Sequence, residues 1–66
     1  MKIAEVEARL AQIAALERVP DGSAHELEDA LFLDVLKAIA AGASNPAELA
    51  AVAIKSADLH IKRWFE

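Results

Sequence analysis

The sequence predicts an all-α fold, in which three helices and a short C-terminal fourth helix form a single domain over residues 1–66 of a dimeric protein. Three observations lead to this prediction. Apolar residues recur every three or four positions over two long stretches, which is the periodicity of helices. Ala, the residue with the highest helix propensity, is abundant. The two Pro and two Gly residues lie between these stretches or after them, where they separate one helix from the next.

The first predicted helix covers about residues 2–18 and carries a narrow apolar stripe. Spacings of three, four and three place four residues on one side of it: Ile3, Val6, Leu10 and Ile13. The stripe has two interpretations. It packs against the rest of its own domain, or it is a self-association surface between two copies, as in a short coiled coil. Two heptads are too few to decide between them.

A break precedes the second helix. Pro20 disfavours helical backbone before it, and Gly22 permits a tight turn. Ser23 and Glu26 have the spacing of a capping box, in which each side chain binds the backbone amide of the other residue. We therefore expect the second helix over about 24–41.

This second helix is predicted to be the central one. It stops at Gly42, a residue suited to the left-handed backbone that follows many helices. One apolar stripe recurs every four residues: Leu27, Leu31, Val35 and Ile39. Phe32 and Leu36 widen this stripe into a face too broad for a single neighbouring helix.

Leu33 lies off that face, between Asp29 and Lys37 on the helical surface. It has two interpretations. A single exposed Leu is common in folded proteins. Alternatively, Leu33 and Phe32 together form part of a contact with a partner.

The third helix has a clear start. Asn45 suits the N-cap, Pro46 suits the first helical position, and Glu48 lies in the first turn. These residues predict a helix over about 46–55.

A further break is expected after the third helix. If that helix continued to the end of the chain, Ile61 and Phe65 would lie on a different side from Leu49. A break at residues 55–58 removes this conflict, because Ser56 or Asp58 can cap a new helix. We therefore expect a short fourth helix over about 58–65.

Size and charge restrict the class of protein. A chain of 66 residues buries a small core, and the absence of Cys excludes disulfides and thiolate metal sites, so association of two copies is the remaining source of stability. The net charge of −4 is unfavourable for a general binder of nucleic acids. The sequence contains neither a signal peptide nor a stretch of about 18 apolar residues, so we expect no membrane partner and a cytoplasmic location.

We expect neither catalysis nor a bound cofactor or metal. The Ser residues lie at helix starts or at the predicted breaks, and the two Gly residues are too few for a phosphate-binding loop. His25 and His60 have no paired ligand pattern around them. Three acidic residues near the start of the second helix are explained by the helix dipole: Glu26, Glu28 and Asp29.

Residues 49–64 partly fit a helix-turn-helix for DNA binding. Ala51, Ile54, Ile61 and Trp64 occupy positions that such a motif buries. However, Lys55 stands where the turn prefers Gly. From residue 45 onward there are three basic and three acidic residues, which is unfavourable because phosphate contacts supply most non-specific affinity. DNA binding is therefore the alternative prediction, and a nucleic-acid partner is not the preferred one.

The C-terminal run LAAVAIKSADLHIKRWFE resembles a signature of small helical proteins from bacteriophages, prophages and mobile elements of proteobacteria. Eight residues match without a gap: Leu49, Ala50, Ile54, Lys55, Ser56, Leu59, Arg63 and Trp64. His60 departs from an Asp in that signature, Ile61 departs from a Phe, and the final Phe65-Glu66 also differs. The resemblance covers 18 residues closely and about 40 loosely. It implies a phage-type origin and no particular activity.

Trp64 has two interpretations. Its indole closes the small core against the central helix, or it is a hot spot for a partner, because Trp and Arg are enriched at interfaces. The candidates for partner contact are Phe32, Leu33, His60, Arg63, Trp64 and Phe65. We expect a non-enzymatic interaction protein of phage type that binds a regulator or defence protein in the host cytoplasm. We expect it to form a homodimer through the first helix, the central helix, or both.

Overall fold

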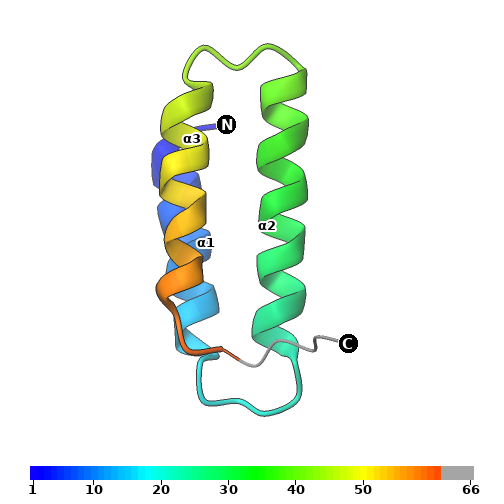
Figure 1. Cartoon of the computed structure of the whole chain (residues 1–66), viewed down its shortest axis with the longest axis vertical. Coiled ribbons are helices and arrows are strands. Elements are labelled where there is room, and N and C mark those ends of the chain that lie inside the picture. The colour runs from blue at the N-terminus through cyan, green and yellow to red at the C-terminus, as the bar shows by residue number, and fades with distance from the viewer. Residues whose placement is uncertain (62–66) are drawn as a thin grey trace.

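The structure, a computed structural model, describes residues 1–61, and these contain helices and no strand. The α-helices are α1 (Ile3–Ala15), α2 (Ser23–Ala40) and α3 (Pro46–Ala53), and a 3₁₀ helix, η1 (Ile54–Asp58), follows α3 directly. Each α-helix packs against the other two, and Figure 1 shows the three lying side by side along one direction. The all-α prediction is confirmed.

The end of α1 lies before the predicted end at residue 18. The amides of Leu16 and Glu17 donate to carbonyls three residues earlier, at 3.0 and 3.1 Å. Such bonds tighten and close the last turn of a helix. Pro20, shortly afterwards, disfavours helical backbone at the residue before it. The chain therefore turns between α1 and α2 without a further helical turn.

The predicted capping box between Ser23 and Glu26 is wrong. Gly22 holds the N-cap position with φ of 85°, and Ser23 is already the first residue of α2. The amide and the hydroxyl of Ser23 both donate to Oδ1 of Asp21, at 2.9 and 2.6 Å. These two hydrogen bonds hold the pKa of the Asp21 carboxyl below its ordinary value, and the bond from the hydroxyl has the larger effect. The Glu26 amide donates to the Gly22 carbonyl instead, at 3.1 Å.

The predicted end of α2 is confirmed. Gly42 has φ of 94°, the left-handed conformation that glycine adopts at low cost. Its amide donates to the carbonyl of Ile39 at 3.0 Å, and the amide of Ala43 donates to the carbonyl of Ala38 at 3.1 Å. This pair of hydrogen bonds is a Schellman motif, which satisfies carbonyls that the helix leaves without partners.

Asn45 and Pro46 start α3 at the predicted position. The Asn45 side chain makes no capping hydrogen bond, whereas its carbonyl accepts the amide of Leu49 at 3.0 Å. The α-helix ends at Ala53, before the predicted end at residue 55, because η1 begins at Ile54.

The core takes side chains from all three α-helices and from the segment after η1. Its buried apolar residues are Val6, Ile13, Ala24, Leu31, Val35, Leu49, Ala53 and Ile61. Within α2 the buried positions include Ala24, Leu31 and Val35, at spacings of seven and four. The predicted stripe recurs every four residues and therefore drifts about 40° per step around a helix of 3.6 residues per turn. For this reason its two ends leave the core: Leu27 is 36% exposed and Ile39 is partly buried.

The predicted break after α3 is present as η1, but the fourth helix does not begin at residue 58. Residues 59–61 are not helical. The Leu59 amide donates to the Ser56 carbonyl at 3.0 Å, and Ser56 itself is fully buried. The remainder of the predicted helix, residues 62–65, lies outside the described residues.

Candidate interaction site

The apolar stripe of α1 faces the core of its own chain. Val6 and Ile13 are fully buried, and Ile3 and Leu10 are half-buried and pack against that core. Of the two interpretations of this stripe, the structure therefore shows packing within the domain. Val6 and Ile13 therefore have no exposed surface to offer a second copy.

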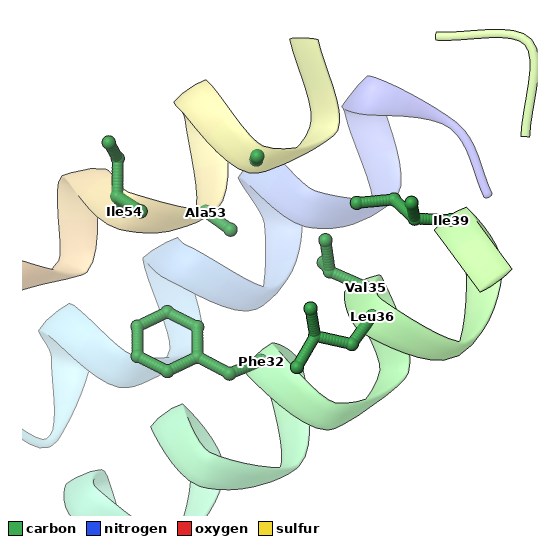
Figure 2. A pocket seen from close by; sticks show the side chains of 7 residues that line it. Phe32, Val35, Leu36, Ile39, Ala53 and Ile54 are labelled. Carbon is green, nitrogen blue, oxygen red and sulfur yellow. The ribbon is translucent and has the colours of Figure 1, made fainter. Parts of the chain in front are cut away.

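A groove with an apolar lining runs between α2 and the C-terminal end of α3, with a volume of about 240 Å³. Figure 2 shows Phe32 and Leu36 on α2 and Ile54 at the start of η1 on the opposite wall. The seven lining residues are Phe32, Val35, Leu36, Ile39, Ala50, Ala53 and Ile54. The α3 wall carries the small side chains of Ala50 and Ala53, which leaves the space between the helices unfilled.

The rim of this groove is strongly exposed. Leu36 is 63% exposed and Ile54 is 64% exposed, although both are large and apolar. Phe32, by contrast, is half-buried and lies against the core. The sequence prediction placed Phe32 among the contact residues but not Ile54. It named Ile54 only as a position that a helix-turn-helix buries and as a match to the phage-type signature.

Leu33 lies on α2 three residues before Leu36 and is 53% exposed. It does not line the groove. It belongs to a second surface, which we call the outer face of α2. The outer face consists of exposed residues only: Asp29, Ala30, Leu33, Leu36, Lys37 and Ala40.

Titratable side chains gather near the start of α2. His25 Nε2 lies 3.4 Å from Oδ2 of Asp29, and His25 Nδ1 lies 3.9 Å from Oε1 of Glu28. Glu28 is only 4% exposed. Glu28 therefore shares the buried side of α2 with Ala24 and Leu31, a position that the helix dipole alone did not predict. The nearby Ser23 hydroxyl donates to Oδ1 of Asp21 at 2.6 Å.

The remaining predicted contact residues do not join this surface within the described part of the chain. His60 is exposed, and its amide donates to Oε2 of Glu17 at 3.4 Å, close to the end of α1. Arg63, Trp64 and Phe65 lie outside the described residues. Across residues 1–61, no group of three or more acidic, His or Cys side chains is arranged to hold a metal ion.

The helix pairs differ from those of a helix-turn-helix. In that motif a short turn separates two helices that cross steeply. Here α3 continues directly into η1, and residues 59–61 are not helical. α2 and α3 lie side by side in opposite directions (Figure 1). Within residues 1–61 no recognition helix follows α3.

Comparisons with protein-family models, with curated proteins and with solved structures found no match to this chain. Among the helices of residues 1–61, none is both long and apolar enough to cross a membrane. The site is therefore interpreted from its own geometry.

Proposed function

We propose that this chain is a non-enzymatic protein-interaction module of phage or prophage type, which forms a homodimer and binds another protein in the host cytoplasm. The observation that carries the proposal is the exposed apolar rim of the groove, formed by Leu36 and Ile54. Contiguous exposed apolar surface on a small protein marks a site of interaction.

The groove has the character of a receptor for an amphipathic helix or a short apolar segment. Such ligands place apolar anchors at helical spacing into a groove between two helices. Covering one large apolar side chain contributes about 1.5–3 kcal/mol. Covering Leu36 and Ile54 therefore contributes free energy to a contact at this groove.

The partner is proposed to be a host regulator or defence component. The resemblance of the C-terminal run to phage-type proteins supports a host partner, and the acidic balance of the chain is unfavourable for binding to nucleic acids. The phage-type origin and the host partner both rest on that resemblance.

The test is a pull-down from a proteobacterial host lysate, with the intact chain as bait, compared with two variants. Ile54→Glu places a charge on the groove rim and is expected to abolish capture of a specific protein. Ala8→Glu adds the same charge to an exposed position of α1 and is the matched control, which is expected to capture normally. Circular dichroism verifies that both variants remain helical.

Equal capture by wild type and Ile54→Glu would contradict the proposal that the groove binds the partner. Duplex DNA serves as the second ligand in the same experiment. A band shift that weakens steeply with salt would favour the alternative, a small DNA-binding regulator.

A further inference from the structure

Within residues 1–61, the outer face of α2 is exposed. Figure 1 shows α1 and α3 on one side of α2, and Leu31 and Val35 of α2 are buried. The outer face carries Leu33 and Leu36, which are 53% and 63% exposed. Leu36 also forms the edge of the groove, whereas Leu33 does not line it.

Four residues of this face form two pairs, and the two members of each pair are equally far from Leu33 in the sequence. Asp29 lies four residues before Leu33 and Lys37 lies four residues after it. Ala30 lies three residues before and Leu36 three residues after. Residues three and four apart are neighbours on the surface of a helix, so all five share one patch. Opposite charges occupy one pair of positions, and a small and a large apolar side chain occupy the other.

We infer that two copies of this chain associate through the outer faces of their α2 helices, antiparallel, with the two-fold axis passing beside Leu33. The inference deepens the self-association that forms part of the proposed function, and it names the surface. In a two-fold dimer the same patch is used by both copies, so each contact occurs twice.

This arrangement gives five of the six outer-face residues, all except Ala40, a complementary neighbour. Asp29 lies beside the partner's Lys37, and Lys37 beside the partner's Asp29. Leu36 lies over the partner's Ala30, where the small side chain leaves room. The two copies of Leu33 meet at the axis. Opposite charges and interlocking large and small side chains are the properties of a specific helix pair.

The parallel arrangement lacks this complementarity. It would place Asp29 beside the partner's Asp29 and Lys37 beside the partner's Lys37, so that both pairs repel. It would also oppose two copies of Leu36 and leave a gap between two copies of Ala30. The charge order along α2 therefore selects a second copy in the antiparallel direction.

The groove and the outer face are separate surfaces that share one edge, Leu36. Ile54 lines the groove and is not part of the outer face. Leu33 is part of the outer face and does not line the groove. Variants at these two positions, with Leu36 left unchanged, therefore test the two surfaces independently.

Charge reversal provides the test. Analytical ultracentrifugation across the micromolar range is expected to show a monomer–dimer equilibrium for the wild type. Asp29→Lys alone, or Lys37→Asp alone, places like charges together twice and is expected to weaken dimerisation by about tenfold or more. An equimolar mixture of these two single variants is expected to form a heterodimer, because each introduced charge then faces its opposite. Native mass spectrometry identifies that heterodimer by its mass.

Three further variants complete the experiment. The double variant Asp29→Lys with Lys37→Asp is expected to dimerise like the wild type. Leu33→Glu is expected to be a folded monomer, with helicity verified by circular dichroism. Glu7→Lys reverses a charge on an exposed position of α1 and is expected to leave dimerisation unchanged.

A wild-type chain that stays monomeric throughout this range would overturn the inference, as would a mixture that forms no heterodimer. Failure of this dimer inference can be distinguished from failure of the proposed binding of a host protein. Capture of the host protein depends on Ile54, whereas dimerisation depends on Leu33, Asp29 and Lys37. Loss of dimerisation with capture retained would remove only the present inference.

Discussion

The guanidinium Nη1 of Arg9 lies 2.7 Å from the carboxylate Oδ2 of Asp34, and this ion pair joins α1 to α2. The two residues are 25 positions apart in the sequence, so the contact depends on the packing of the helices. Their side chains are 26% and 47% exposed, which allows solvent to screen the attraction.

A double-mutant cycle measures this pair. Arg9→Ala, Asp34→Ala and the double variant are expected to give a coupling free energy of about 0.5 kcal/mol, which falls as salt is added. Urea unfolding of the four proteins gives the value. Arg18→Ala, at an exposed position after α1, is the control and is expected to show no coupling with Asp34→Ala. A coupling free energy near zero at low salt would show that the pair does not form in solution.

The stripe of α1 yields a second prediction, because Ile13 is fully buried whereas Ile54 is 64% exposed. Ile13→Val is expected to lower the free energy of unfolding by about 1 kcal/mol, because it leaves a small cavity. The same chemical change at Ile54 is the matched control and is expected to change stability by less than about 0.5 kcal/mol. Thermal or urea unfolding of both variants is the measurement. Equal effects at both positions would contradict the packing of α1 described above.

Residue types with strong backbone preferences allowed two helix boundaries to be predicted, the end of α2 and the start of α3. Gly42 ends α2 and Pro46 begins α3, because left-handed backbone and a fixed φ are properties of single residue types. Ser23 failed as a capping residue for a local reason. Asp21, two positions earlier, supplies a carboxylate that accepts both the amide and the hydroxyl of Ser23.

The direction in which each helix faces the core could not be read from spacing alone. Leu27 and Ile39 fit the stripe of α2 but lie away from the most buried positions, and Glu28 occupies the buried side. The rotation of α2 about its axis is fixed by where α1 and α3 dock. For the same reason, the groove could not be predicted, since Ile54 becomes a rim residue only when η1 lies opposite α2.

Gly42 gives the third prediction. A Cβ built on Gly42 has no neighbouring atom within 4 Å, so a substitution there meets no clash and its cost lies in the backbone φ of 94°. Gly42→Ala is expected to lower the free energy of unfolding by about 1 kcal/mol. D-alanine at this position, introduced by chemical synthesis, prefers positive φ and is expected to stabilise the protein instead. Thermal unfolding compares the three proteins, and equal destabilisation by both alanines would disprove the backbone explanation.

Asp21 gives a prediction about pH. The Ser23 hydroxyl, and after it the Ser23 amide, donate to the Asp21 carboxylate and hold its pKa below the ordinary value of 3.8. The folded state therefore binds this proton less readily than the unfolded state does. The stabilisation from Asp21 is complete above the ordinary value, declines as the pH falls below it, and is lost below the folded pKa.

Ser23→Ala removes the hydroxyl and keeps the amide, so the pKa of Asp21 is expected to rise toward 3.8 without reaching it. Titration of the Asp21 carboxyl carbon by nuclear magnetic resonance measures this change directly. Ser44→Ala, at an exposed position between α2 and α3, is the matched control and is expected to leave the pKa of Asp21 unchanged. If the pKa of Asp21 were the same in wild type and Ser23→Ala, the hydroxyl of Ser23 would not be the main cause of the lowered pKa. The start of α2 would then depend on the amide of Ser23 and the left-handed Gly22 alone.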